Sequence, residues 1–220
     1  MSLFLSTQLS MEHTIASQLF SGKKYPHEVL SEIKDFILKL GQTLPKETFD
    51  CKGDGIWIAK SAKVAPTAYI GGPCIIDENA EVRHCAFIRG SAIIGKGAVV
   101  GNSTELKNVV LFDSVQVPHY NYVGDSVLGY KSHMGAGAIT SNVKSDKTSV
   151  FVSYGEDRFD TGKKKFGAIL GDHVEIGCGS VLNPGTVIAS HSSVYPLSSV
   201  RGFIAEGSIY KKAGEVVKRR

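Results

Sequence analysis

The chain has 220 residues, with 25 Lys or Arg against 21 Asp or Glu, and its formal net charge is +4 at pH 7. A chain of this length should bury about 70% of its unfolded surface, so it can fold without disulfides or a structural metal. The charge is too small for a dedicated nucleic-acid binder and suits a phosphorylated small molecule. The four cysteines show no C-x-x-C or zinc-ligand spacing, and no run of about 18 apolar residues occurs. These features predict a cytoplasmic protein with reduced thiols, no metal, and neither a membrane nor a nucleic acid as partner.

Residues 1–54 are predicted to form an N-terminal helical cap followed by a linker. The segment after Pro26 carries apolar residues at helical spacing, which form one stripe on a polar helix: Val29, Leu30, Ile33, Phe36, Ile37 and Leu40. Pro26 suits the first turn of this helix, and Gly41 is a candidate C-cap. A weaker helix is predicted over residues 12–20, and a linker over residues 45–55. We expect the helix to cover the open end of the repeats that follow and to carry no chemistry.

A six-residue repeat begins at Ile58. Aliphatic residues recur at every sixth position, and most are followed four positions later by a small residue: Ile58, Val64, Ile70, Ile76, Val82, Ile88, Ile94, Val100 and Leu106. A sustained hexapeptide repeat is the signature of a parallel β-helix, in which three repeats form one triangular coil and equivalent residues stack about 4.8 Å apart. The pattern returns at Leu170 and continues to Val200. Residues 55–210 are therefore predicted to form a β-helix with an aliphatic interior, and residues 211–220 a basic C-terminal tail.

Two cations lie 18 residues apart in this repeat. Arg89 and Lys107 each follow an inward aliphatic residue, where other repeats carry glycine. Stacked on neighbouring coils at about 5 Å, they would repel one another by roughly 1 to 3 kcal/mol, a cost that a bound anion would remove. The pair is a candidate phosphate clamp. The alternative is that both side chains extend into water or pair with a neighbour such as Glu105.

The repeat slips after Leu106. Phe112 still fits the old period, and new phases are marked by Val117, Val123, Leu128 and Met134. Slips of this kind mark insertions on one face of a solenoid, often its binding face. The slip therefore locates the candidate functional region.

Residues 144–167 are predicted to be an insertion. Alternation of Val150, Val152 and Tyr154 before Gly155 indicates a β-hairpin that projects from the coil. The run Lys163–Lys165 is either a set of phosphate contacts or a solvated charge run.

Three segments around the slip resemble a known family. Residues 101–108, residues 118–125 with the pattern H-x-x-Y-x-G-D, and residues 135–142 with G-A-G-x-x-x-x-N carry the match. Over residues 56–204 the chain resembles the left-handed β-helix acetyltransferase domain of the bifunctional N-acetylglucosamine-1-phosphate uridyltransferase/glucosamine-1-phosphate acetyltransferase family and its archaeal sugar-1-phosphate nucleotidyltransferase relatives. The left-handed sense of the β-helix is implied only by this resemblance, because crossovers between parallel strands are overwhelmingly right-handed. The implied fold is mainly β: a single-stranded left-handed parallel β-helix of hexapeptide repeats, with an N-terminal helical cap and an inserted hairpin.

The resemblance also implies a set of catalytic and substrate-binding residues. His119 is the implied general base, and histidine suits this role because its pKa lies near neutrality. The backbone amide of Ala136, in a tight glycine-flanked segment, is the candidate oxyanion donor. The implied sugar-phosphate contacts are Arg89, Lys107, Tyr122, His133 and Asn142. His133 stands where the family commonly has asparagine, and Val143 where it has tyrosine, so these departures bear on the choice of sugar.

In the family, the later coils bind acetyl-CoA between neighbouring subunits of a trimer. This places Gly177 and Cys178 near the thioester, and Lys211 or Lys212 near the CoA phosphates. Cys178 as a nucleophile is an alternative, but the sequence assigns it no base. The implied partners are acetyl-CoA as co-substrate, an amino-sugar phosphate and further copies of this chain in a homotrimer.

The predicted function is thus an acetyl-CoA-dependent N-acetyltransferase that acts directly on a glucosamine-1-phosphate-like acceptor, in nucleotide-sugar (UDP-N-acetylglucosamine) biosynthesis. The sequence has no nucleotidyltransferase loop of the L-x-x-G-x-G-T-R type, so we do not expect it to make a nucleotide sugar. One alternative is a non-catalytic trimerisation or regulatory module. A zinc carbonic anhydrase on the same fold is disfavoured, because no H-x-x-x-x-H spacing occurs among His84, His119, His133, His173 and His191.

Overall fold

The computed structural model describes residues 9–154 and 157–219. The start of the predicted cap (residues 1–8), the hairpin turn at Gly155, the side chain of Tyr154 and the last residue of the tail lie outside the described part. Within it, no helix is long and apolar enough to span a membrane.

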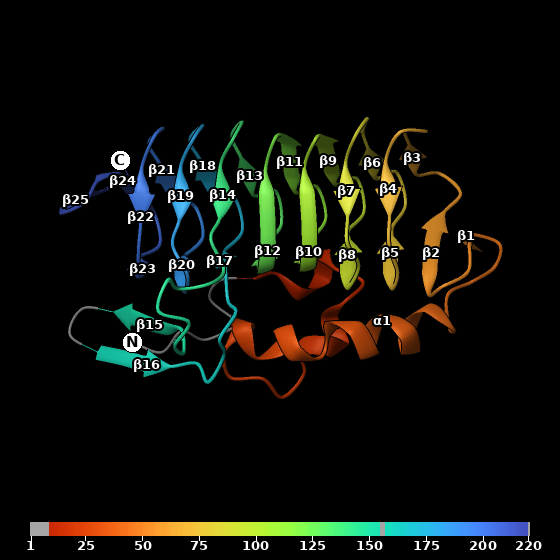
Figure 1. Ribbon diagram of the computed structural model, residues 1–220, viewed down its shortest axis with the longest axis horizontal. Coiled ribbons are helices and arrows are strands. Elements are labelled where there is room, and N and C mark those ends of the chain that lie inside the picture. Colours follow the sequence, from red (N-terminus) through yellow and green to blue (C-terminus); the bar gives the residue numbers. More distant parts are fainter. Residues whose placement is uncertain (1–8, 155–156, 220) are drawn as a thin grey trace.

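The strands wind into a parallel β-helix whose columns follow the predicted register. Ile58 pairs with Ile76 and Ile76 with Ile94, so residues 18 apart in the sequence stack on successive coils. Val82 and Val100 stack in the same way, and the aliphatic residues of these columns fill the interior. The predicted fold class is confirmed: a mainly β solenoid of hexapeptide repeats, with a short N-terminal helical region and a small hairpin (Figure 1).

Each coil contributes one strand to each of three faces. The first, which we call the covered face, contains β2 (Ile56–Ala59), β5 (Cys74–Ile76), β8 (Ala92–Ile94), β17 (Ala168–Leu170), β20 (Thr186–Ile188) and β23 (Phe203–Ile204). The second face contains β3 (Lys63–Val64), β6 (Glu81–Val82), β9 (Val99–Asn102), β11 (Gln116–His119), β13 (His133–Met134), β18 (Glu175–Ile176), β21 (Ser193–Val194) and β24 (Ser208–Lys212). The third face contains β4 (Tyr69–Ile70), β7 (Phe87–Ile88), β14 (Ile139–Thr140), β19 (Val181–Leu182) and β22 (Ser199–Val200).

Two longer strands mark where the repeat slips. β10 (Glu105–Leu111) and β12 (Tyr122–Leu128) run from the third face through the corner into the covered face. Leu111 stacks on Ile94 and Leu128 on Leu111, so each of these coils has 17 residues instead of 18. The missing residue lies at the same corner in both coils, because Leu106 still pairs with Ile88 at the 18-residue spacing.

The structure corrects one inward position and supports the others. Leu111 takes the inward place predicted for Phe112. Phe112 is buried elsewhere, with its ring edge-on to Phe20 at 5.6 Å. The predicted new phases do fill inward columns, since Val117 pairs with Val100 and Met134 with Ile176.

The N-terminal segment covers the side of the solenoid and not its open end, contrary to the prediction (Figure 1). It forms short 3-10 turns and one α-helix: η2 (Met11–His13), η3 (Ser17–Phe20), η4 (Pro26–Ser31) and α1 (Ile33–Gly41). The single predicted helix is therefore divided at Glu32. Gly41 is the last helical residue and not a left-handed cap. It has no side chain because a Cβ there would lie 2.4 Å from the Trp57 ring.

An outward apolar column explains this placement. On the covered face, the residue before each inward aliphatic is itself apolar, and the column runs through Trp57, Ile75, Ile93, Val110, Val127, Ile169, Val187 and Phe203. Leaving such a stripe in water is unfavourable by about 25 cal/mol per Å² of apolar area. α1 packs on β5, β8 and β10, and η4 on β12, so this face is buried on both sides.

Both ends of the solenoid are closed by antiparallel strands. The predicted linker contains β1 (Phe49–Cys51), which pairs with β2, and the predicted basic tail contains β25 (Glu215–Lys218), which pairs with β24. These pairings satisfy backbone groups that an open edge would expose. The two segments are therefore structural elements and not a linker and a free tail.

The inserted hairpin is confirmed. β15 (Phe151–Tyr154) pairs antiparallel with β16 (Asp157–Asp160), and it lies beside β23 at the C-terminal end of the covered face. Val150 and Val152 are fully buried, and a Cβ on Gly185 would lie 2.8 Å from the Val150 side chain. The N-terminal helices and this hairpin thus cover neighbouring lengths of the same face (Figure 1).

Candidate functional site

The predicted site residues gather at two edges of the third face. The edge shared with the covered face holds a cluster that we call the polar corner: Lys107, Asn108, Asp125 and Asn142. The edge shared with the second face holds what we call the histidine column: His119, Ala136 and Cys178.

Asp125 is the centre of the polar corner. Its carboxylate is 3% exposed, and it accepts hydrogen bonds from Lys107 Nζ at 2.9 and 3.1 Å and from Asn108 Nδ2 at 2.9 Å. Asn142 Nδ2 also donates to it. A carboxylate this buried requires such partners, since an unpaired buried charge costs several kcal/mol. Asp125 is not among the predicted site residues. It is in register with Asn108, 17 residues earlier, a spacing that the regular 18-residue coil does not predict.

Arg89 and Tyr122 adjoin this corner on the third face. Arg89 Nη1 donates to Glu105 Oε1 at 2.9 Å, and Glu105 stacks directly on Tyr122 in neighbouring strands. The Tyr122 phenol interacts with Asn142. Burial raises the pKa of Tyr122, and the negative charges of Asp125 and Glu105 raise it further. The phenol therefore remains a hydrogen-bond donor at neutral pH.

Four predicted substrate-binding residues thus lie in or beside the polar corner: Arg89, Lys107, Tyr122 and Asn142. The two cations among them do not form an unpaired phosphate clamp. The expected repulsion between Arg89 and Lys107 does not arise, because Glu105 neutralises the first and Asp125 the second. The pairing with Glu105 that the sequence left open is the one observed for Arg89. The two pairs differ in strength, since the Arg89 side chain is 47% exposed and the Lys107 side chain 26%. A ligand can exchange with the Arg89 pair more easily.

The histidine column is fixed by backbone hydrogen bonds between successive coils. Gly137 N–H donates to His119 O at 3.0 Å, and Gly179 N–H donates to Ala136 O at 2.8 Å. His119, Ala136 and Cys178 are all exposed. No acceptor for the Ala136 N–H occurs among the residues described, so this amide is available as a donor to a ligand.

Asn121 holds the turn that carries His119, and sequence reasoning gave it no role. It is 2% exposed, accepts the His119 N–H at 3.1 Å, and donates to Gly135 O at 2.8 Å and Ala138 O at 3.0 Å. These bonds tie the coil of His119 to the coil of Ala136, so the imidazole and the amide sit on one rigid corner.

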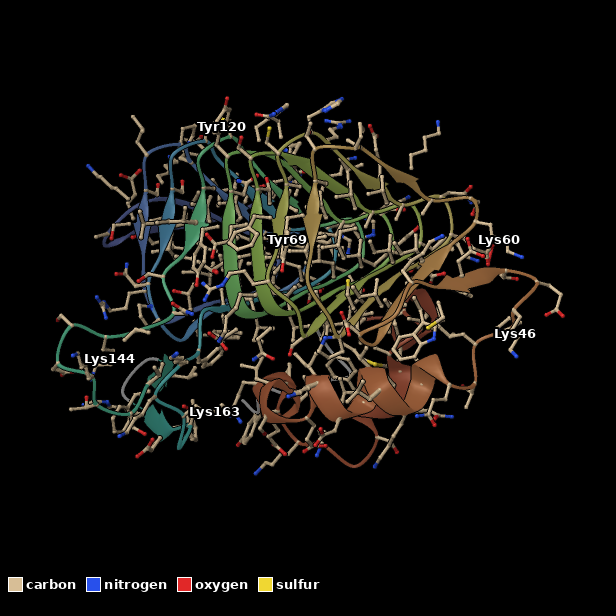
Figure 2. All side chains as sticks on the ribbon, turned by 45° about the vertical axis from the view of Figure 1, so that its right-hand side comes forward. Lys46, Lys60, Tyr69, Tyr120, Lys144 and Lys163 are labelled. Atoms are coloured by element: carbon tan, nitrogen blue, oxygen red, sulfur yellow. The ribbon has the colours of Figure 1, made fainter. Side chains whose placement is uncertain are left out.

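The two edges face each other across a single strand. Tyr122 and Asp125 are three residues apart on β12, which corresponds to about 10 Å. In Figure 2, Tyr120, which follows His119, projects at the top of the solenoid, and Lys144, two residues after Asn142, lies on the insertion at the lower left. No hydrogen bond or ion pair among the described residues joins His119 to the polar corner.

Several predicted site residues lie elsewhere or have structural partners. His133 is on the second face, where its Nδ1 lies 2.8 Å from Glu175 Oε2, so it does not belong to the polar corner. Gly177 allows close coil packing, because a Cβ there would lie 2.3 Å from Pro196 N. Lys211 and Lys212 lie at the solenoid end, with Nζ atoms 3.2 and 3.5 Å from Glu215 carboxylate oxygens.

In the basic run Lys163–Lys165 of the insertion, Lys163 has a structural partner. Lys163 Nζ contacts Ser31 Oγ at 3.2 Å and thereby ties the insertion to η4. Burial lowers the pKa of Lys163. Lys164 and Lys165 remain exposed, as the solvated alternative predicts.

Comparison with known proteins places the solenoid in a family. The family model described as the GMPPB C-terminal domain matches residues 70–199. The bifunctional protein GlmU of Methanococcus aeolicus is 33% identical over 177 residues, covering 72% of this chain and 43% of that protein. The bifunctional sugar-1-phosphate nucleotidylyltransferase/acetyltransferase of Sulfurisphaera tokodaii is 33% identical over 112 residues, covering 51% of this chain and 28% of that protein. The chain therefore spans less than half the length of these relatives. A solved hexapeptide transferase family protein from Anaplasma phagocytophilum aligns with a TM-score of 0.42 and 18% identity, covering 74% and 78% of the two chains.

Proposed function

Because the chain belongs to the GMPPB C-terminal domain family, we propose that it acts as an acetyl-CoA-dependent N-acetyltransferase for an amino-sugar phosphate resembling glucosamine-1-phosphate. The observation that carries this proposal is the histidine column. The exposed His119 and the Ala136 amide, which has no acceptor among the described residues, lie on consecutive coils that the buried Asn121 joins. Both relatives are named as bifunctional proteins, and the name of the Sulfurisphaera protein includes an acetyltransferase.

The chemistry is direct transfer. The sugar amine attacks the thioester carbonyl carbon, His119 takes the proton that the nitrogen loses, and the C–S bond breaks to release CoA thiolate, which is then protonated. The Ala136 N–H donates to the oxyanion of the tetrahedral intermediate. Cys178 lies two coils from His119 in the same column and needs no nucleophilic role.

The sugar phosphate lies across β12. Its phosphate displaces Glu105 from Arg89, which is the weaker of the two ion pairs, while Tyr122 and Asn142 contact the sugar. The length of β12 from Tyr122 to Asp125, about 10 Å, is on the scale of a hexosamine phosphate, and we place its amine at His119, beyond the Tyr122 end. Lys107 remains with Asp125 and adds positive charge behind the phosphate.

A homotrimer would complete the CoA site, and the solenoid leaves two faces for it. The covered face is occupied by the chain's own helices and hairpin, so assembly uses the second and third faces. On the third face Tyr69 is 62% and Phe87 43% exposed, with ring centroids 5.4 Å apart. Such exposed aromatic pairs are typical of subunit contacts. Gly177, Cys178, Lys211 and Lys212 are the proposed CoA contacts.

The test is turnover by the purified chain. Thiol release from acetyl-CoA is measured with glucosamine-1-phosphate, and N-acetylation of the sugar is checked by mass spectrometry. Glucose-1-phosphate, which has no amine, is the control and should give no release. The proposal fails if no hexosamine phosphate gives thiol release above this control.

A non-catalytic trimerisation or regulatory module is the second candidate. The ion pairs favour it, because Glu105 and Asp125 leave neither Arg89 nor Lys107 unpaired. Light scattering, which gives the oligomeric state, and the turnover assay together distinguish the enzyme from the non-catalytic module. A trimeric mass without turnover indicates the module, and a monomer at micromolar concentration contradicts both readings of the assembly.

A further inference from the structure

The inserted hairpin forms a second basic site, away from the histidine column. A cavity of about 250 Å³ lies between the insertion and the solenoid, lined by Lys144, Phe151, Arg158, Pro184, Arg201 and Gly202. Lys144 begins the insertion, Arg158 lies on β16, and Arg201 lies between β22 and β23 of the solenoid. Cations from three separate segments therefore converge on one cavity.

The cationic side chains are held in place by contacts that leave most of their charge uncompensated. Arg158 Cζ lies 3.8 Å from the centroid of the Phe151 ring, and Arg201 Nη2 donates to Asn183 Oδ1 at 3.2 Å. Neither arginine forms an ion pair with a described carboxylate. Lys144 Nζ contacts Asp146 Oδ2 at 3.2 Å, and the Asp146 side chain is 56% exposed. Among the side chains that the structure describes here, three positive charges thus face one solvated negative charge.

We propose that this cavity binds the phosphate group of a small phosphorylated ligand. A phosphate monoester carries close to two negative charges at neutral pH, which matches the excess of two positive charges in the cavity. Arginine side chains bind phosphate through paired N–H donors, and stacking on Phe151 fixes the plane of Arg158. The cavity is smaller than the usual 300 Å³ or more of drug-sized sites, at about the size for a phosphorylated monosaccharide.

The ligand would connect the insertion to the solenoid. Arg158 belongs to the hairpin and Arg201 to a solenoid corner, so a phosphate bound by both fixes the hairpin against the coils. Lys144 follows Asn142 by two residues, and Asn142 donates to Asp125 in the polar corner. Occupation of this cavity therefore also restrains the segment that leads to the proposed sugar site.

The experiment is calorimetric titration of the full chain with glucose-1-phosphate and, separately, with inorganic phosphate. Arg89→Ala is used as the background throughout, so that binding at the polar corner does not contribute. Adding Arg158→Ala or Arg201→Ala should weaken binding about 10- to 100-fold, because each removes a charged donor. Arg201→Lys should lose less, since it keeps the charge and loses only the paired geometry. Tighter binding of the ester than of inorganic phosphate identifies a phosphorylated organic ligand, and the reverse identifies free phosphate.

Lys164→Ala is the matched control, because it removes an exposed cation of the same insertion that does not line the cavity. It should bind like the background chain. Hydrogen exchange gives a second readout: ligand should slow exchange of the β15 and β16 amides in the background chain and not in the Arg201→Ala chain. The proposal is overturned by the absence of saturable binding, by unchanged binding in both arginine variants, or by an equal loss in Lys164→Ala. None of these results depends on acetyl transfer.

Discussion

The regular coils before residue 107 and the two short coils that follow differ by one residue per turn. In the regular coils, the corner between the third and covered faces carries glycines such as Gly71 and Gly90, and its one ion pair among the described residues is the exposed one between Arg89 and Glu105. In the short coils the strand continues through that corner, and Asn108 and Asp125 sit there with φ of 55° and 48°. Asparagine and aspartate tolerate this left-handed conformation better than most residues. Deleting one residue thus replaces a glycine corner with a polar one.

The two kinds of coil share their packing and differ at the proposed site. Both halves share the same inward columns and the same outward apolar column on the covered face. The third face differs, because its outward column changes from Tyr69 and Phe87 to Glu105 and Tyr122 at the first short coil. Polar outward side chains on this face begin where the coil shortens, and the experiments below test whether they serve the proposed function.

The largest effect is expected for His119→Ala. Loss of a general base typically lowers kcat by about 10²- to 10⁴-fold, while the affinity for acetyl-CoA should change little. Raising the pH should partly restore the rate, because more of the sugar amine is then neutral. Steady-state kinetics measure both.

Cys178→Ala is the control in the same column, and it should keep most of the activity because no acyl-enzyme forms. Loss of turnover in Cys178→Ala with retention in His119→Ala would contradict direct transfer.

Arg89→Ala should raise KM for glucosamine-1-phosphate about 10- to 100-fold, because it removes a charge-assisted contact to the phosphate. KM for unphosphorylated glucosamine should change far less. Arg83→Ala is the matched control: Arg83 also pairs with a glutamate, Glu81 at 3.0 Å, but lies on the second face of a regular coil. Equal effects on the two sugars, or equal effects of the two arginines, would show that Arg89 binds no phosphate.

Asp125→Asn should lower the free energy of unfolding by about 1 to 3 kcal/mol, since it removes the charge that pairs with Lys107 in a buried setting. Asparagine fits the same φ, so the backbone should not add strain. Denaturant unfolding measures the change. Glu81→Gln in the exposed Arg83 pair should alter stability by no more than about 0.5 kcal/mol. If both variants lose the same small amount, the polar corner is no better stabilised than a regular coil.

The smallest expected effect is on the pH dependence of stability, and it concerns His27. This residue lies on η4 and contacts the insertion. Its ring stacks on Phe166 at 5.3 Å, and burial, followed by the charge of Lys163, lowers the pKa of His27 from 6.5 to about 4. The unfolded chain therefore takes up a proton at higher pH than the folded chain, and stability is lost as pH falls from about 6.5 towards 4. Between pH 7 and pH 6 the loss should be about 0.7 kcal/mol. His27→Gln should remove this part of the pH dependence, measured by denaturant unfolding at both values. An unchanged slope in the variant would mean that His27 is not held neutral.

The coil could be predicted from the amino-acid pattern alone. Period-six aliphatic residues, such as Ile58 and Ile76, specify which side chains face inward, and this pattern is local enough to be read without contacts. The alternation around Val150 and Val152 likewise specified the hairpin.

The sequence indicates that the covered face is buried on both sides, but the position predicted for the N-terminal helix was wrong. Ile75 and Ile93 are apolar next to inward aliphatic residues, a sign that both sides of that strand are buried. The helix stripe after Pro26 shows that a helix must pack on something apolar, but it does not show which surface. Both the outward column of the solenoid and its open end offer apolar area, and only the tertiary packing chose the column.

The polar corner could not be predicted from the sequence. Lys107, Asp125 and Asn142 lie on successive coils, and their meeting depends on where one residue is missing from each coil. A shift of the deletion to another corner would keep the same hydrophobic pattern and separate these side chains. The sequence records that the period slips, but the ion pair that replaces an unpaired clamp depends on backbone register and burial, which are properties of the folded chain.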